Sequence, residues 1–310
     1  MTVAAGEAPD IDEAVERLRA GGLVAFPTET VYGLGADARQ AAAVERIFAV
    51  KRRPLGHPLI VHLPDAAALD GWAAHVPGTA RRLAEAHWPG PLTLLVERSG
   101  RVPDIVTGGR PTVGVRVPAH PLAQRLLRAF DGGLAAPSAN RFGKVSPTTA
   151  AHVRADLGAD VDLILDGGPC AIGVESTIVD CTSDPPTLLR HGAVTIEELS
   201  ATAGVAVIEG TAGPSRAPGM LESHYAPAAA VELVSDGVAA AARAAVVRAE
   251  GRSVDVLDPG PDGAAYARHL YEWLREADAR GLELLVVVPP PDTGLGAAVN
   301  ERLRKAAAPR

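Results

Sequence analysis

One stretch, from residue 22 to 63, constrains the fold more than any other part of this 310-residue chain. It opens with a short apolar run, residues 22–26, which lies between glycine and proline as a buried strand often does. The segment 27–35 that follows is rich in hydroxyl groups. Its two glycines, Gly33 and Gly35, allow the backbone to come close to a ligand. The sequence therefore predicts a strand that ends in a ligand-facing loop.

A basic triplet occupies the centre of the same stretch. The composition and apolar spacing of residues 41–50 predict a helix, which Lys51, Arg52 and Arg53 follow directly, and residues 58–63 predict a second strand. Cations are common at a helix C-terminus because the helix dipole favours them there, and an isolated triplet is explained most simply in this way. The triplet could also form one wall of an anion pocket. Strand, helix and strand in this order predict an α/β fold.

Composition excludes several classes of function. The net charge is -7 and there is no basic tail, so we expect no broad nucleic-acid surface and no stable nucleic-acid binding. Cys170 and Cys181 are the only cysteines, too few for a disulfide framework or a cysteine zinc site. The sequence has no export signal and no apolar run near the ~18 residues of a membrane helix. We therefore expect an unexported protein of the reducing cytoplasm, with no membrane partner.

Polar residues also occur within or just after three later predicted strands. Arg116 falls within the alternating strand 112–118, where it needs either water at a sheet edge or a partner anion. The segment 137–149 is rich in hydroxyl and amide groups. It is either a cluster of turns and caps or a cradle for phosphate oxygens that includes Lys144. Arg190, just after an apolar run, is either a phosphate contact or an exposed turn. The sequence contains no Walker-type phosphate loop, so any nucleotide site is of another kind.

The last third of the chain predicts a separate small domain. Glycine, proline and alanine dominate segment 209–229, which is typical of a linker. Met220, His224 and Tyr225 within it suggest that it docks onto another part of the protein. Strands and helices then alternate over residues 231–307, which predicts a small parallel sheet.

Seven stretches resemble, in order and spacing, the threonylcarbamoyl-AMP synthases of the YrdC-like superfamily. They are PTETVYGLGADA, KRRPLGHPLIVH, WPGPLTLL, TVGVRVPAHP, APSANRFGKVSPT, GGPCAIGVESTIVD and LLRHGAVT. The likeness spans about residues 12 to 205, and APGMLESHYAP with the small domain resembles the longer, two-domain branch. It implies a YrdC-like twisted mixed sheet with flanking helices around a basic cleft, plus a small Rossmann-like C-terminal domain. The implied divisions are a catalytic domain over 8–205, a linker covering the cleft over 206–229 and a C-terminal α/β domain over 230–310.

The resemblance also implies a reaction. ATP, L-threonine and bicarbonate give threonylcarbamoyl-AMP and pyrophosphate, the first step toward N6-threonylcarbamoyladenosine in tRNA, and a downstream tRNA threonylcarbamoyl transferase receives the adenylate. Such chemistry needs positioning and cationic stabilisation of phosphate oxygens rather than a side-chain nucleophile. In agreement, the sequence contains none of the common nucleophile or metalloprotease motifs. Mg²⁺ is expected with ATP, but no residue is assigned as its ligand.

Site residues carry over from the matching motifs. For L-threonine they are Thr30, His62, Arg116, the backbone of Ala136, and Ser176. For ATP they are Arg53, His57, Thr112, Ser138, Ser146, Arg190 and Tyr225. The expected catalytic set is Lys51, Arg53, Ser138 and Asn140, while Tyr32, Lys144 and His224 are secondary candidates for the cavity.

Two departures from the family pattern accompany these assignments. His57 replaces a more usual asparagine, and Leu221 and Glu222 stand where basic or aromatic residues are more usual, which weakens the case for a phosphate contact by the linker. The alternative functions are an RNA-binding or regulatory module of the same fold, and carbamoyl transfer in hydrogenase maturation. The second would need zinc-finger-like and acylphosphatase-like segments, and the sequence contains neither.

Overall fold

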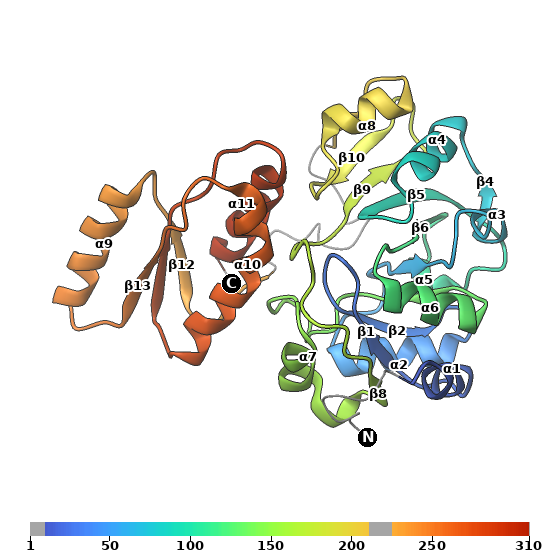
Figure 1. Cartoon of the computed structure of the whole chain (residues 1–310), viewed down its shortest axis with the longest axis horizontal. Helices are drawn as coiled ribbons and strands as arrows, with labels where there is room; N and C mark the ends of the chain where they lie inside the picture. The colour runs from blue at the N-terminus through green and yellow to red at the C-terminus, as the bar shows by residue number, and fades with distance from the viewer. Residues whose placement is uncertain (1–9, 211–224, 310) are drawn as a thin grey trace.

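The structure is a computed structural model that describes residues 10–210 and 225–309. Two bodies make up this part of the chain (Figure 1). The large body, residues 10–210, surrounds a mixed sheet of 11 strands, and the small body, residues 230–309, surrounds a parallel sheet of three. The expected α/β class, with a mixed sheet followed by a small parallel one, is confirmed.

The large sheet has the strand order β11-β10-β9-β5-β6-β3-β7-β2-β1-β8, and β4 pairs with β5 beside this path. Its strands are β1 (Val24–Phe26), β2 (Gly33–Asp37), β3 (Ile60–His62), β4 (Ala73–His75), β5 (Leu92–Arg98), β6 (Thr112–Arg116), β7 (Leu134–Ala135), β8 (Leu163–Ile164), β9 (Thr177–Asp180), β10 (Thr187–Arg190) and β11 (Ile208–Glu209). Strand β3 is parallel to β6 and antiparallel to β7, which brings the ends of these strands together near the sheet centre.

Eight α-helices and one 3₁₀ turn flank this sheet in the described residues. They are α1 (Ile11–Arg19), α2 (Ala41–Lys51), α3 (Leu69–Trp72), α4 (Gly78–His87), α5 (Asp104–Thr107), α6 (Pro121–Phe130), α7 (Ala150–Leu157), α8 (Ile196–Ala203) and the 3₁₀ turn Gly158–Asp160. Asp10 caps the N-terminus of helix α1, where its carboxylate accepts a hydrogen bond from the backbone N–H of Glu13. The apolar face of α1 packs on α6. Helix α2 ends in Lys51, and Arg52 follows it in the left-handed conformation.

The small body repeats strand and helix, as its apolar pattern predicts. It contains β12 (Ala230–Leu233), α9 (Gly237–Ala249), β13 (Val254–Leu257), α10 (Gly263–Ala279), β14 (Leu284–Val287) and α11 (Leu295–Ala307). The strand order is β12-β14-β13, all parallel. Helices α10 and α11 face the large body, whereas α9 lies on the far side (Figure 1). No described helix is both long and apolar enough to cross a membrane.

One hydrophobic cluster joins the two bodies. Val31, Val145 and Val174 of the large body are buried in the same cluster as Tyr266 and Tyr271 of α10. Removal of these side chains from water favours docking of the small body against the large one.

Some elements differ from the sequence expectation. Residues 33–37 form β2, antiparallel to β1, whereas we expected residues 33–35 to belong to a ligand-facing loop. A Cβ atom at Gly35 would lie 2.8 Å from the ring of Phe26, so this glycine is needed for close packing and not for ligand approach. The short elements β4, α7 and β11 were also not foreseen.

Candidate active site

A cavity of about 50 Å³, room for several water molecules, lies where the loop after β1 meets the ends of β3, β6 and β10. Its wall is formed by residues from many separate segments. They are Thr28, Thr30, Val31, Gly33, Arg53, Ile60, His62, Arg116, Ala136, Pro137, Ser138, Glu175, Ser176, Arg190 and Tyr225. The five residues expected at L-threonine all belong to this wall, together with Arg53, Ser138, Arg190 and Tyr225 from the set expected at ATP.

Arg116, the last residue of β6, is buried with an exposed fraction of 4%. Its guanidinium donates to Glu29 Oε1 at 2.7 Å and to Thr30 Oγ1 at 2.9 Å. It also donates to the carbonyl of Gly90 at 3.2 Å. The sequence allowed either a partner anion or exposure at a sheet edge, and the structure provides the anion from the loop after β1. A guanidinium has five N–H donors, so Arg116 can also bind a ligand carboxylate.

Ser176 and Arg190 form a second polar group in the wall. The Ser176 hydroxyl is 2.8 Å from Thr93 Oγ1 and accepts a hydrogen bond from Arg190 Nη2 at 3.0 Å. Arg190 also donates from Nε to the Ser176 carbonyl at 2.9 Å. The cation is therefore held at the end of β10, buried beside the cavity, rather than in an exposed turn.

His62 supplies a neutral imidazole. Burial, reinforced by the cation of Arg116, lowers the pKa of His62 to about 3. Its ring lies edge-on to Phe26, with the centroids 5.9 Å apart. Among the described residues no group bonds its buried Nδ1 atom, and an orphaned buried polar atom in a cavity wall is a place where a ligand or water can bind.

Arg53 is another cation of the cavity wall. Its Nη2 atom donates to the carbonyl of Pro58 at 3.0 Å, and its guanidinium lies 5.5 Å from the ring centroid of Phe142. Burial, partly offset by Tyr225, lowers the pKa of Arg53 to about 10, so the side chain stays cationic at neutral pH. Ser138, the other expected catalytic residue in the wall, lies in a backbone bridge with Gly33.

Lys51 and Asn140 lie behind the wall rather than in it. The Lys51 ammonium donates to the carbonyls of Ser138 at 2.6 Å and Asn140 at 2.5 Å. The Asn140 amide in turn donates to the carbonyls of Arg141 at 2.8 Å and Lys144 at 2.7 Å. Burial, reinforced by the cation of Arg53, lowers the pKa of Lys51 well below its ordinary value. Both residues thus fix the loop that presents Ser138.

Ser146 also lies outside the cavity lining, next to a buried carboxylate. Its hydroxyl donates to Glu175 Oε1 at 2.6 Å. Glu175 is itself part of the wall, as is Tyr225, which is 1% exposed and adopts a positive φ of 61°. The Tyr225 ring stacks on Tyr271 of α10 at 5.8 Å.

The remaining expected residues occupy other positions. His57 lies edge-on to Phe142 at 5.4 Å, next to the Arg53 guanidinium rather than in the lining. Burial, with the cations Arg53 and Arg110, lowers its pKa. Thr112 begins β6, at the far end of the strand from Arg116.

Neither secondary candidate in the described part of the chain lines the cavity. The Tyr32 hydroxyl instead donates to the Gly168 carbonyl at 2.7 Å. Lys144 lines a separate surface depression with Arg52 and Arg141. His224, Leu221 and Glu222 lie outside the described residues.

Sequence reasoning assigned no role to two carboxylates, Glu29 and Glu175. Both lie beside arginines of the site, and a buried arginine needs a nearby anion. That requirement was a usable signal for Glu29, the only carboxylate in the loop after β1. Glu175 offered no such signal, because its ion-pair partner, Arg302, lies 127 residues further along the chain.

The described residues do not fit a resident metal. They contain no group of three or more His, Cys, Asp or Glu side chains arranged to hold an ion. The Glu175 carboxylate in the wall already accepts hydrogen bonds from Ser146, Tyr271 and Arg302. The described wall of the cavity carries the cations Arg53, Arg116 and Arg190 together with the Glu175 carboxylate.

Comparison with known proteins defines the family. One family model, described as telomere recombination, matches residues 16–192, and another, described as the C-terminal domain of threonylcarbamoyl-AMP synthase, matches residues 194–308. A threonylcarbamoyl-AMP synthase of Pyrococcus abyssi is 42% identical and is aligned over 93% of this chain and 91% of its own length. The chain belongs to the threonylcarbamoyl-AMP synthase family.

Further relatives support the same assignment. A threonylcarbamoyl-AMP synthase of Bacillus subtilis is 39% identical over 97% of this chain and 94% of its own length. A crystal structure of Pyrococcus abyssi Sua5 complexed with L-threonine superposes with a TM-score of 0.91 at 41% identity, covering 96% of this chain and 94% of that one. The YrdC-like fold expected from the sequence motifs is thereby confirmed, together with the two-domain branch of the family.

Proposed function

We propose that this member of the threonylcarbamoyl-AMP synthase family converts ATP, L-threonine and bicarbonate to threonylcarbamoyl-AMP and pyrophosphate. The threonine amine first adds to bicarbonate with loss of water, which gives a carbamate. A carbamate oxygen then attacks the α-phosphorus of ATP, and the bond from that phosphorus to the bridging oxygen breaks as pyrophosphate leaves. The observation that carries the proposal is one cavity lined by three buried arginines, Arg53, Arg116 and Arg190, in a chain aligned with named synthases over nearly its full length.

The threonine end is proposed at Arg116. Its guanidinium, oriented by Glu29, binds the substrate carboxylate, and Thr30 and Ser176 offer hydroxyl groups nearby. The neutral His62 ring can hydrogen-bond the substrate without repelling its ammonium group. The backbone of Ala136 completes this side of the cavity.

The nucleotide end is proposed at Arg53, Ser138 and Arg190. Negative charge builds up on the phosphate oxygens and on the leaving pyrophosphate, and buried cations stabilise it strongly because little water screens them. His57, Thr112, Ser146 and Tyr225 remain proposed neighbours of ATP. Lys51 and Asn140 stay in the proposed catalytic set and act through the Ser138 loop that they fix.

Tyr225 lies in the wall of the cavity and is buried against the small body. We infer that ATP binding displaces Tyr225, and that segment 206–229 acts as the cover between a catalytic domain over 8–205 and a C-terminal domain over 230–310.

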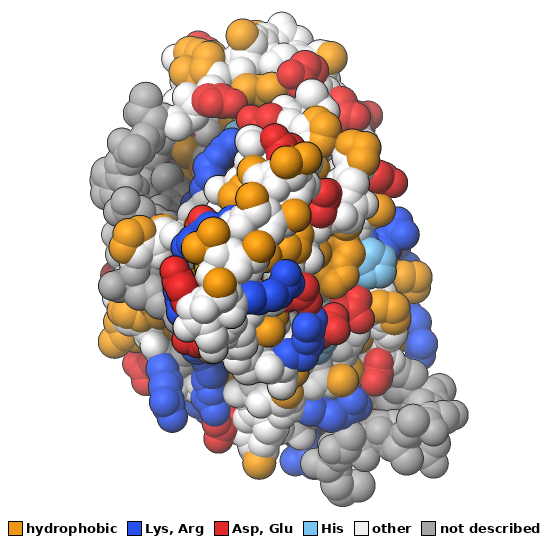
Figure 2. Space-filling model, turned by 90° about the vertical axis from the view of Figure 1, so that its left-hand side faces the viewer, with side chains coloured by type: hydrophobic (Ala, Val, Ile, Leu, Met, Phe, Trp, Pro, Cys, Tyr) orange, Lys and Arg blue, Asp and Glu red, His pale blue; other side chains and the backbone are white. Residues whose placement is uncertain are grey.

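The remaining participants are proposed from the chemistry. Any Mg²⁺ enters with the ATP phosphates, and water and phosphate oxygens supply its ligands. We expect a tRNA threonylcarbamoyl transferase of the cytoplasm to consume the adenylate. We expect no stable nucleic-acid binding. The face of the small body in Figure 2 carries basic, acidic and hydrophobic side chains side by side.

Detection of the product tests the proposal. The purified chain is incubated with ATP, L-threonine and ¹³C-bicarbonate, and the adenylate is sought by mass spectrometry. The expected product is threonylcarbamoyl-AMP carrying one ¹³C atom. An adenylate of threonine without the label, or no adenylate, would refute the proposed reaction.

A further inference from the structure

The small body supplies the counter-ion of a buried carboxylate in the cavity wall. Arg302 of α11 has no exposed side-chain surface, and its Nε atom donates to Glu175 Oε2 at 3.0 Å. Tyr271 of α10 donates to the same oxygen at 2.8 Å. Burial would raise the pKa of Glu175, but Arg302, Arg190 and two hydroxyl donors outweigh this effect and lower it to about 2. Glu175 is therefore an anion inside the proposed ATP site.

An anion at this point conflicts with ATP unless another group neutralises it. Glu175 and Arg190 line the same cavity, and Ser146 donates directly to the carboxylate. After Arg302, the cation that acts most strongly on the Glu175 carboxylate is Arg190, one of the groups proposed to bind phosphate. Without Arg302, the carboxylate would compete with the nucleotide for that guanidinium and repel its phosphates.

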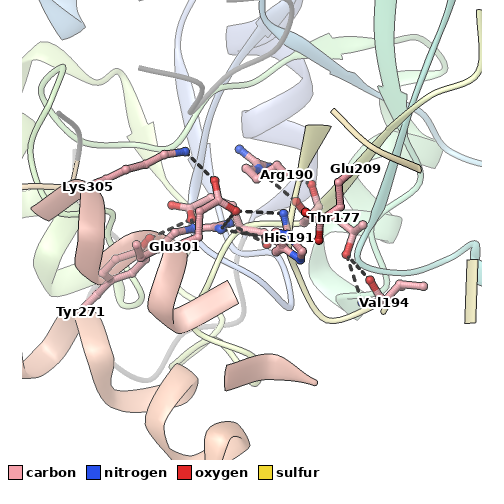
Figure 3. Close-up of polar contacts among 11 residues, drawn as sticks. Thr177, Arg190, His191, Val194, Glu209, Tyr271, Glu301 and Lys305 are labelled. Atoms are coloured by element: carbon pink, nitrogen blue, oxygen red, sulfur yellow. Dashed lines mark hydrogen bonds and ion pairs between the residues drawn. The ribbon is translucent and has the colours of Figure 1, made fainter. Parts of the chain in front are cut away.

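Helix α11 also fixes the backbone next to Arg190. Arg302 Nη1 donates to the carbonyl of His191 at 2.8 Å, and Glu301 Oε2 accepts the backbone N–H of His191 at 3.0 Å. Figure 3 shows Glu301 and Lys305 facing Arg190 and His191 across the boundary between the two bodies. Both hydrogen bonds are made to the backbone of His191, which directly follows Arg190. Helix α11 can therefore set the direction in which the Arg190 guanidinium points.

Arg302 also contacts Tyr225, the residue of segment 206–229 that lines the cavity. Its guanidinium lies 5.5 Å from the ring centroid of Tyr225, and the same ring stacks on Tyr271. One arginine of the small body thus contacts the carboxylate in the wall, the strand end beside Arg190 and the aromatic ring that lines the cavity.

We propose that Arg302 is a positioning residue for ATP: it neutralises Glu175 and holds the end of β10, so that the carboxylate does not compete with the nucleotide for Arg190. This assigns the C-terminal domain a role in nucleotide affinity. The proposal rests on the proposed function, since it takes the cavity to be the ATP site.

Binding measurements with the full chain test it. The ligands are L-threonine and α,β-methylene ATP, in which the bond that breaks is replaced by a stable one. Arg302→Gln is expected to weaken binding of the ATP analogue by about tenfold or more while threonine affinity changes by less than about threefold. Glu175→Gln combined with Arg302→Gln removes both charges and is expected to recover the analogue affinity to within about threefold of the wild type.

Controls separate positioning from folding. Arg304→Gln changes an exposed arginine of the same helix, paired only loosely with Asp292 at 3.5 Å, and should bind both ligands as the wild type does. If Arg302→Gln does not fold, the double variant and Arg302→Lys are used instead. The double variant should bind the ATP analogue nearly as the wild type does. Arg302→Lys keeps the positive charge but loses the planar guanidinium with its several N–H donors, so it should bind the analogue more weakly than the wild type.

Three results would overturn the inference. They are unchanged analogue binding in Arg302→Gln, equal losses for both ligands, and no recovery in the double variant. A wild-type chain that binds neither ligand would instead refute the proposed function itself.

Discussion

The pair of Arg116 and Glu29 allows fold stability and substrate binding to be separated. Both side chains are nearly buried, with exposed fractions of 4% and 12%, and their charged atoms lie 2.7 Å apart. Removal of one partner of a buried ion pair costs about 3–5 kcal/mol, because it leaves an uncompensated charge in the interior. Arg116→Gln should therefore lower the free energy of unfolding by about that amount. The same substitution should weaken L-threonine binding at least about tenfold, the loss of roughly 1.4 kcal/mol or more of charged hydrogen bonding.

The double variant makes the prediction specific. When Glu29→Gln is combined with Arg116→Gln, no buried charge is left unpaired, and most of the lost stability should return. Threonine binding should stay weak, because the cation proposed to hold its carboxylate is still missing. Urea unfolding and isothermal titration with L-threonine measure the two quantities. A double variant as unstable as Arg116→Gln, or one that binds threonine normally, would refute this reasoning.

Three further predictions follow from the same geometry. Lys51→Met removes the ammonium that anchors the Ser138 carbonyl, so kcat for pyrophosphate release should fall at least about tenfold while threonine affinity changes little. An unchanged kcat would remove Lys51 from the catalytic set. The folded-state pKa of His62, about 3, lies below its ordinary value of 6.5, so the unfolded chain binds a proton more readily between these values. The stabilisation from neutral His62 is therefore complete above pH 6.5 and falls by up to about 1.4 kcal/mol per pH unit as the pH drops toward 3. His62→Gln should flatten this part of the pH profile of stability measured by urea unfolding, and an identical slope would contradict a buried, neutral His62. Tyr225→Ala should alter the KM for ATP severalfold while the KM for threonine stays constant, and parallel changes in both would place Tyr225 elsewhere.

The sequence predicted those parts of the fold that local pattern determines. The alternation over residues 231–307 was sufficient for the small parallel sheet, because each strand and helix there has its own apolar period. The conformation of residues 33–37 was missed. Glycine favours turns in general, but residues 33–37 pair with β1 and Gly35 packs against the Phe26 ring, and no local pattern records these contacts.

The site was predictable to the extent that it lies in continuous motifs. The residues expected at threonine meet in one cavity, although they come from five separate segments. The family motifs could not distinguish a wall residue such as Arg53 from one that fixes the wall from behind, such as Lys51, because both lie in one basic triplet. The pairing of Glu175 with Arg302 depends on docking of the two bodies, and no local pattern records it.

The central claim is that one cavity joins threonine, bicarbonate and ATP in a single reaction. Its most direct test is pyrophosphate release from ATP by the purified full-length chain, measured with both co-substrates present and with each omitted in turn. Release is expected only when L-threonine and bicarbonate are present together. Release at the same rate without threonine, or in bicarbonate-depleted buffer, would contradict it.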